Sequence, residues 1–251
     1  MRKTPRRVVA VTGGTRGIGL AIAELFYRQG NAVAVCSRSQ RRPSLPKAVV
    51  HREVDVRQRD QVQGFIRSVL KEFGSLDVLV NCAGVSRWKA VEEIDARFVG
   101  DVIETSLLGT LWGCAAAAPV LPRGGCIVNV SSLAGKRGSA NNSAYCAAKF
   151  AVNGMTQALA KELGPRGIRV NAVCPVYVET AELLTALAEP SSPAHGQRVK
   201  KYLTSFASTQ TALGRLPTAQ EVAEAVGFLA SPAASAITGQ CLNVDCGTLP
   251  Q

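Results

Sequence analysis

Short apolar runs alternate with longer amphipathic stretches along almost the whole chain. The short runs are nearly continuous in apolar residues, which is typical of parallel strands that are buried on both faces. The longer stretches repeat apolar residues at helical spacing, and several of them end at a glycine, as helices commonly do. The pattern predicts strands within residues 7–14, 31–38, 48–56, 76–84, 124–132, 168–175 and 240–245, and helices within residues 17–30, 61–74, 95–118, 144–164 and 219–231.

This alternation predicts an α/β fold with a doubly wound parallel sheet of about seven strands and helices on both faces. The sequence shows no internal repeat and no low-complexity linker that would divide it. We therefore expect a single domain over residues 1–251.

Two segments interrupt the pattern. Residues 39–47 contain two prolines where a crossover helix is expected, which predicts a loop or a very short turn. Residues 176–215 are long for a connection inside a compact domain, and such segments are usually functional, so we expect a substrate lid there. Within it, Leu183, Leu184 and Leu187 have helical spacing and either face an apolar ligand or pack on the domain.

The composition indicates a cellular location and argues against metal sites and disulfide bonds. Of the 251 residues, 47% are hydrophobic and 19% are charged, as in ordinary globular proteins. No apolar run approaches the roughly 18 residues of a membrane span, and the N-terminus has no signal-peptide pattern, so we expect a cytoplasmic protein with no membrane partner. Eight cysteines without a C-x-x-C pair and only two histidines argue against a zinc site or a disulfide framework.

The formal net charge of +11 favours anionic partners. The basic residues are spread along the chain, and no aromatic residues are interleaved with them, so we do not expect a nucleic-acid partner. An anionic cofactor or a thioester-type substrate accounts for the charge equally well.

The sequence TGGTRGIG, residues 12–19, follows the first predicted strand and opens the first predicted helix. Glycines in that position let the backbone approach a pyrophosphate, and the helix N-terminus offers free N–H groups to it. The spacing of Gly13, Gly17 and Gly19 differs from the usual G-x-G-x-x-G. The strand–turn–helix context nevertheless indicates a dinucleotide site.

The end of the second predicted strand bears on which dinucleotide binds. An acidic residue there would hold the 2′-hydroxyl of NAD, but the sequence has Ser37 and Arg38, followed by Arg41 and Arg42. Arg16 adds a further cation from the glycine-rich turn. Arginines bind a phosphate through charge-assisted hydrogen bonds, so we predict NADP(H) rather than NAD(H). The alternative is that Arg41 and Arg42 are simply solvated loop charges.

Tyr145 and Lys149 lie four residues apart in SAYCAAK, which puts them on the same face of a helix. Free tyrosine has a pKa of about 10, and a nearby ammonium group would lower it. The same spacing also occurs in helices where both side chains only pack, so the other motifs must decide whether the pair is catalytic.

Taken together, these motifs resemble the classical short-chain dehydrogenase/reductase (SDR) family over nearly the whole chain. TGGTRGIG is similar to the cofactor turn of that family, DV at Asp55 and Val56 to its adenine-contacting pair, and NCAG at residues 81–84 to its N-N-A-G motif. RVNAVCP and AITGQCLNVD resemble its later strand signatures.

The Ser–Tyr–Lys set of the family is matched by Ser132, Tyr145 and Lys149. The resemblance implies a Rossmann-fold domain in which Tyr145 is the general acid for carbonyl reduction and the base for alcohol oxidation. It implies that Lys149 lowers the pKa of the tyrosine and holds the nicotinamide ribose, and that Ser132 positions the carbonyl.

The resemblance also implies a set of cofactor contacts and no metal. The set comprises Gly13, Thr15, Arg16, Gly17, Ile18, Gly19, Ser37, Arg38, Asp55, Val56, Asn81, Ala83, Gly84, Tyr145, Lys149, Pro175, Val178 and Thr180. In it, the Val178 backbone would bind the carboxamide, and Thr180 would lie near the carboxamide or the pyrophosphate.

Three positions depart from the family pattern. Ser106, in ETSL, replaces an asparagine whose backbone carbonyl holds a water that links the lysine to solvent; Ser106 keeps a carbonyl for such a relay. Val176 replaces a glycine, which narrows the space near the nicotinamide. Cys246 replaces another glycine and is expected to affect packing or a subunit contact.

Within the family the chain looks most like the β-ketoacyl thioester reductases, which implies an NADPH-dependent reductase of 3-oxoacyl groups carried on acyl carrier protein (ACP) or CoA. Arg123 and Arg166 are expected to flank the site as docking arginines for an acidic carrier protein. Arg198, Lys200 and Lys201 in the expected lid either meet a phosphopantetheine or CoA phosphate or are simply solvated.

Two other functions stay open. The apolar lid also allows a secondary-metabolite, polyketide or hydroxysteroid-type alcohol dehydrogenase. The departures at Ser106 and Val176 allow an NADP-binding protein with little catalysis. Because the family commonly forms tetramers through its fourth and fifth long helices, we expect a homotetramer or a dimer.

Overall fold

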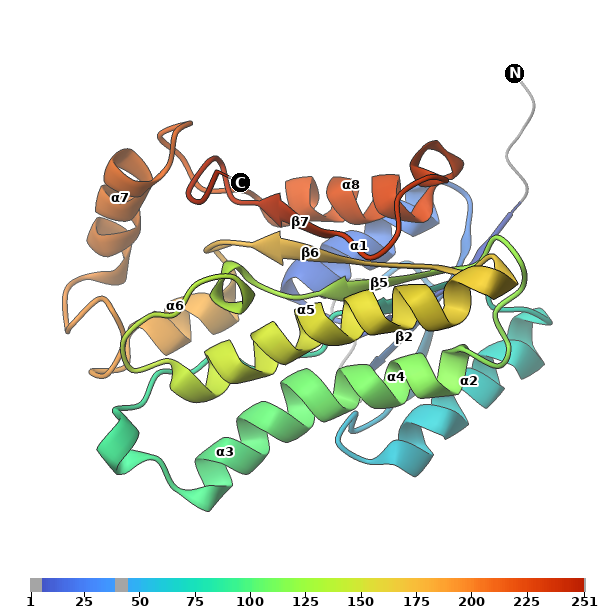
Figure 1. The fold of residues 1–251 in the computed structure, drawn as a ribbon, viewed down its shortest axis with the longest axis horizontal. Helices are drawn as coiled ribbons and strands as arrows, with labels where there is room; N and C mark the ends of the chain where they lie inside the picture. Colours follow the sequence, from blue (N-terminus) through green and yellow to red (C-terminus); the bar gives the residue numbers. More distant parts are fainter. Residues whose placement is uncertain (1–5, 39–44, 251) are drawn as a thin grey trace.

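The computed structural model describes residues 6–38 and 45–250. In this part of the chain, seven parallel strands form one sheet in the order β3-β2-β1-β4-β5-β6-β7 (Figure 1). The strands are β1 (Val8–Thr12), β2 (Ala32–Ser37), β3 (Val50–Glu53), β4 (Val78–Asn81), β5 (Cys126–Val130), β6 (Arg169–Pro175) and β7 (Cys241–Val244). The order reverses between β1 and β4, so the predicted doubly wound sheet is confirmed.

Helices cover both faces of the sheet (Figure 1). They are α1 (Gly17–Arg28), α2 (Arg59–Phe73), α3 (Ala96–Ile103), α4 (Gly109–Ala117), α5 (Ser143–Leu163), α6 (Ala181–Leu187), α7 (Val199–Gln210) and α8 (Ala219–Ala230). Side chains of α1 and α8 share one core with the sheet, while α2, α4 and α5 contribute to the core on the opposite face.

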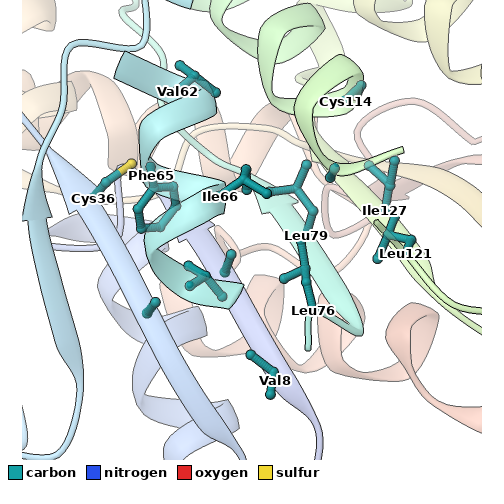
Figure 2. Close-up of a cluster of buried hydrophobic side chains, with 14 of the residues drawn as sticks. Val8, Cys36, Val62, Phe65, Ile66, Leu76, Leu79, Cys114, Leu121 and Ile127 are labelled. Atoms are coloured by element: carbon teal, nitrogen blue, oxygen red, sulfur yellow. The ribbon is translucent and has the colours of Figure 1, made fainter. Parts of the chain in front are cut away.

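The five inner strands, β2, β1, β4, β5 and β6, contribute side chains to both cores because successive side chains point to opposite faces. In β1, for example, Val8 and Ala10 face the helices α2, α4 and α5, while Val9 and Val11 face α1 and α8. Figure 2 shows part of the first core, where Phe65 of α2 is 2% exposed. Burying a side chain of that size stabilises the fold by about 1.5–3 kcal/mol. This two-sided burial explains why these five strands are nearly continuous apolar runs in the sequence.

The long helix predicted over residues 95–118 is present, but it contains a π-helical turn. α3 runs directly into this turn, η2 (Glu104–Leu108), which runs directly into α4. The Asp95 side chain caps the start by accepting a hydrogen bond from the Phe98 N–H at 2.7 Å. A π turn inserts an extra residue, and such turns are frequent at functional sites. Here it holds the fully buried Ser106.

The expected lid region contains two helices that were not among the predicted ones, α6 and α7, at one end of the molecule (Figure 1). They form a small separate core in which Leu187 of α6 and Leu203 of α7 are buried with Trp88. The three leucines therefore differ: Leu187 packs in this core, Leu184 is exposed, and only Leu183 faces a cavity.

Two of the expectations concern the 39–47 segment and Cys246. Arg41 and Arg42 lie outside the described residues, as does most of the 39–47 segment. Cys246 has φ of +52°, a left-handed conformation that favours glycine, which gives a physical reason why glycine is usual there.

All eight cysteines are unpaired, and five of them are buried. Among the described residues, no helix is long and apolar enough to cross a membrane. In the same part of the chain, no cluster of histidine, cysteine and acidic side chains could hold a metal ion.

Candidate active site

A cavity of about 870 Å³ lies where β1, β2, β4, β5 and β6 end. The carboxyl edge of a parallel sheet, at the reversal of strand order, is where such folds bind ligands. The predicted site residues that line it are Gly13, Thr15, Arg16, Gly17, Ile18, Gly19, Ser37, Arg38, Val56, Ala83, Gly84, Ser132, Tyr145, Lys149, Pro175, Val178 and Thr180. Asp55, Asn81 and Ser106 do not line it.

The glycine-rich turn has the close packing of a phosphate cradle. Gly13 and Gly17 have φ of +68° and +53°. A Cβ atom on Gly13 would lie 2.9 Å from the Ala83 Cα, and a Cβ on Gly19 would overlap the Gly13 carbonyl oxygen. Only glycine fits at these positions, and the N-terminus of α1 is left open toward the cavity. These residues therefore fit the pyrophosphate of a dinucleotide.

Two arginines line the expected ribose end of the cavity. Arg38 directly follows β2 and is exposed. The Arg16 Nε forms an ion pair at 3.1 Å with the Glu182 carboxylate of α6, and both side chains are largely exposed. Positive charge at this end fits a 2′-phosphate, although Glu182 competes for one of the two cations.

Asp55 lies beside the cavity rather than in it. Arg57 contacts both Asp55 carboxylate oxygens, with the shortest contact at 2.6 Å. This guanidinium holds the pKa of Asp55 below its usual value. The neighbouring Val54 and Val56 line the cavity instead.

Asn81 was expected to contact the cofactor, but its side chain points into the core. Its Nδ2 donates hydrogen bonds to Asn129 Oδ1 at 3.0 Å and to Cys114 Sγ at 3.3 Å. Gly113 of α4 packs so closely that a Cβ there would overlap Asn81 Oδ1. The Asn81 Nδ2 thus links β4 to β5 and α4, while the buried Oδ1 has no hydrogen-bond partner among the described residues.

The predicted catalytic side chains converge at the middle of the cavity. Ser132 follows β5 and caps the short helical turn η3 (Leu133–Gly135), with its Oγ accepting from the Ala134 N–H at 3.1 Å. Tyr145 and Lys149 project from the first two turns of α5. The Lys149 Nζ donates to the Val130 carbonyl at 2.9 Å and lies 5.6 Å from the centre of the Tyr145 ring.

Burial dominates the electrostatics of this pair. Burial raises the pKa of Tyr145 to about 12, and a hydrogen bond with Ser132 opposes this rise only partly. Burial also lowers the pKa of Lys149 to about 8. The expected lowering of the tyrosine pKa by Lys149 is therefore not what the structure shows. Tyr145 is instead protonated at neutral pH, which is the form that donates a proton.

Ser106 lies just behind the wall of the cavity. A Cβ on Gly84 would lie 3.6 Å from the Lys149 Nζ and 3.7 Å from the Ser106 Oγ, so both groups flank Gly84. The Ser106 Oγ accepts a hydrogen bond from the Val85 N–H at 3.3 Å, and its carbonyl accepts one from the Thr110 Oγ1 at 3.0 Å. One side of the carbonyl expected to serve a water relay is thus already engaged.

Comparison with known proteins agrees with this geometry. A family model described as Enoyl-(Acyl carrier protein) reductase matches residues 13–248, and relatives above 30% identity align over nearly the whole chain. The chain belongs to the short-chain dehydrogenase/reductase family. Members of this family are oxidoreductases that use a nicotinamide cofactor.

Three similar proteins illustrate the range of the SDR family. A Streptomyces virginiae protein, named as a ketoacyl reductase of the monensin polyketide synthase, is 37% identical, with 99% of each chain covered. The cis-4-hydroxycyclohexanecarboxylate dehydrogenase of Sinomonas cyclohexanicum is 39% identical, with 96% of each covered. A crystal structure of actinorhodin polyketide ketoreductase with NADPH has a TM-score of 0.86, with 34% identity and 97% of each chain covered.

The SDR cavity has a second half that the sequence analysis missed. Trp88, Arg137, Tyr177 and Phe206 line it, and the Tyr177 and Phe206 rings lie 4.8 Å apart. Trp88 follows the NCAG motif by four residues, and Arg137 follows Ser132 by five. Aromatic and basic residues soon after strand ends are the signal that could have identified them, because such loops border the site.

In this SDR chain, Arg123 and Arg166 lie too far from the cavity for the docking role expected of them. Arg123 precedes the amino end of β5, and Arg166 precedes the amino end of β6. The cavity lies at the carboxyl ends, so within one chain both arginines are at the opposite edge of the sheet. The Arg166 Nη2 instead donates to the Ala118 carbonyl at 2.8 Å. The expectation that they flank the site is wrong for the single chain.

Proposed function

We propose that the protein is an NADPH-dependent carbonyl reductase that acts on 3-oxoacyl thioesters carried on ACP or CoA. The observation that carries this proposal is the convergence of Ser132, Tyr145 and Lys149 in the same cavity as the glycine-rich turn. Support for the substrate class comes from the relatives named as ketoacyl and polyketide ketoreductases.

A bound nicotinamide dinucleotide supplies the hydride that adds to the carbonyl carbon. The chain itself supplies the proton, because the Tyr145 hydroxyl is protonated at neutral pH and gives its proton to the carbonyl oxygen. The Ser132 hydroxyl hydrogen-bonds to the same oxygen and holds the carbonyl beside the tyrosine. The Lys149 ammonium stabilises the negative charge that the tyrosine oxygen acquires.

The cavity residues would hold the cofactor in a defined order. Gly13, Gly17 and Gly19 would take the pyrophosphate, Arg16 and Arg38 the 2′-phosphate, and the Val178 backbone with Thr180 the carboxamide end. Thr180 also caps α6 by accepting a hydrogen bond from the Leu183 N–H at 3.3 Å. A cofactor in contact with Thr180 would therefore also touch the start of the lid.

The preference for NADPH is expected to depend on Arg38. Replacing Arg38 by serine should lower kcat/KM for NADPH by about tenfold, because an exposed charged hydrogen bond to the 2′-phosphate is lost. The value for NADH should change little, since that cofactor lacks the phosphate. Steady-state kinetics with both cofactors measure the ratio, and Arg97→Ser, an exposed arginine of α3, is the control. An unchanged NADPH-to-NADH ratio would rule out this role for Arg38.

Glu182 is expected to weaken NADPH binding. Replacing it by glutamine frees Arg16 from the 3.1 Å ion pair and removes a negative charge near the phosphates. Because exposed ion pairs contribute only about 0.2–1 kcal/mol, we expect the Kd for NADPH to fall by about two- to fivefold. Fluorescence titration measures this change, and Glu162→Gln, on the exposed face of α5, is the matched control. A weaker affinity in Glu182→Gln would contradict this interpretation of the pair.

We also propose that α6 and α7 act as a substrate lid on a single domain, that the chain assembles as a homotetramer or dimer, and that it acts in the cytoplasm. The lid proposal rests on the cavity contacts of Leu183 and Phe206. The assembly proposal rests on the family resemblance, and the location is supported by eight unpaired cysteines.

A second candidate is an alcohol dehydrogenase for a cyclic substrate. The aromatic wall of Trp88, Tyr177 and Phe206 favours it, and one relative is named as a dehydrogenase of a hydroxylated cyclohexanecarboxylate. NADPH oxidation with an acetoacetyl thioester, an enoyl thioester and a cyclic ketone separates these functions. The thioester reductase requires turnover of the acetoacetyl compound; preference for the cyclic ketone would favour the second candidate.

A further inference from the structure

Arg137 lies at the substrate end of the cavity on a well-fixed backbone. Its N–H donates to the Leu133 carbonyl at 3.1 Å, within the turn that begins at Ser132. Its carbonyl accepts a hydrogen bond from the Cys146 thiol at 4.0 Å, next to Tyr145 on α5. The segments that carry the reacting hydroxyl groups therefore also position Arg137.

The guanidinium of Arg137 is exposed and makes no hydrogen bond or ion pair with any described residue. The other arginine near this end, Arg87, is paired with Asp101 at 3.6 Å. The positive charge of Arg137 lowers the pKa of the Tyr177 hydroxyl, although burial raises that pKa by more. Glu189 also lines this half, but it forms no ion pair with Arg137 in the described part of the chain.

The walls around this free cation are apolar and aromatic. Trp88 is 4% exposed, and the Tyr177 ring packs edge to face against the Phe206 ring of α7. Flat rings of this kind bind an apolar body, and a few polar groups among them fix its orientation. Among the aromatic side chains of this half of the cavity, Arg137 supplies a positive charge that no described residue pairs with.

We propose that Arg137 binds an anionic group of the carbonyl substrate, so that the preferred substrates are ketones or secondary alcohols with an apolar body and a carboxylate or phosphate. This inference rests on the proposed reductase activity and adds the charge of the substrate to it. The planar guanidinium can bind two oxygens of either anion at once, which fixes the substrate's orientation as well as its affinity. The anion is either a carboxylate on the substrate itself or a phosphate on its thioester arm.

Two substrate pairs test the inference with NADPH as the reductant. The first pair is 4-oxocyclohexanecarboxylate and its methyl ester, which differ in the carboxylate. The second is acetoacetyl-CoA and acetoacetyl-N-acetylcysteamine, which differ in the phosphates. In the native protein we expect kcat/KM for the anionic member of at least one pair to exceed that of the neutral member by about tenfold. Arg137→Gln should bring that ratio close to one, mainly through KM, and Arg137→Lys should restore part of it.

Arg97→Gln is the matched control, because Arg97 is an exposed arginine of α3 that does not line the cavity. It should keep the native ratio. Loss of the ratio in the first pair alone assigns the anion to the substrate's carboxylate, and loss in the second alone assigns it to the phosphate. Equal ratios for native protein and Arg137→Gln in both pairs, with turnover intact, would overturn the inference but leave the reductase standing. No turnover of any carbonyl by the native protein would overturn the reductase itself.

Discussion

Replacing Tyr145 by phenylalanine is expected to lower kcat for carbonyl reduction by about 10²–10⁴-fold, the usual contribution of a positioned acid. The change removes only the hydroxyl that supplies the proton, while the ring, which contributes to the wall of the cavity, stays. Affinity for NADPH should remain within about twofold of the native value. Steady-state rates and an NADPH titration on the same preparations measure both quantities.

Tyr27→Phe controls for the loss of a tyrosine hydroxyl as such. Tyr27 is 37% exposed on α1 and does not line the cavity, so its rate should match that of the native protein. Native-like turnover in Tyr145→Phe would show that another group donates the proton. The proposed mechanism would then be wrong even if the substrate class were right.

Replacing Lys149 by methionine is expected to remove activity and stabilise the fold at pH 7. Activity should fall by about 10²–10³-fold, as when one preorganised donor is lost. Burial lowers the Lys149 pKa from 10.5 to about 8, so at pH 7 the native fold holds a charge that would be better solvated in the unfolded chain. Removing it should gain up to about 3 kcal/mol, less about 1 kcal/mol for the lost hydrogen bond to the Val130 carbonyl.

The pH dependence of this gain has a definite sign. Between pH 8 and 10.5 the unfolded lysine keeps a proton that the folded lysine has released. The free energy of unfolding of the native protein therefore rises with pH in this window relative to the variant, by at most about 1.4 kcal/mol per unit. The advantage of Lys149→Met should be full below pH 8 and lost by pH 10.5.

Denaturant unfolding at several pH values measures this difference. Lys161→Met, an exposed position on the same helix, should show no comparable gain and no loss of activity. A variant that is less stable than the native protein at pH 7 would show that the lysine charge is well compensated in the fold. The same measurement thus tests whether the site is held at a cost to stability.

The arrangement of the sheet could be predicted from the sequence because two-sided burial leaves a strong pattern. Continuous apolar runs marked the inner strands, and glycines such as Gly30 and Gly74 marked helix ends. The catalytic side chains could be placed together because spacing on one helix fixes Tyr145 and Lys149 relative to each other.

Other features depended on contacts between distant segments. Asn81 was assigned to the cofactor because its motif adjoins the site, but its partners Asn129 and Cys114 lie far along the chain and draw the amide inward. α6 is only seven residues long, and α7 was missed although its apolar residues recur at helical spacing. The pattern could not show that the two helices pack on each other and on Trp88. The rise in the Tyr145 pKa depends on burial, which spacing along the helix does not reveal.

The central claim is that this chain reduces a carbonyl with NADPH through Tyr145. The most direct measurement is the consumption of NADPH together with the yield of alcohol from an acetoacetyl thioester, for native protein and Tyr145→Phe. We predict one alcohol formed per NADPH consumed by the native protein, and a loss of at least about 100-fold in the variant. Tight NADPH binding without formation of alcohol from this thioester or from the ketones named above would contradict the claim and indicate a binding protein.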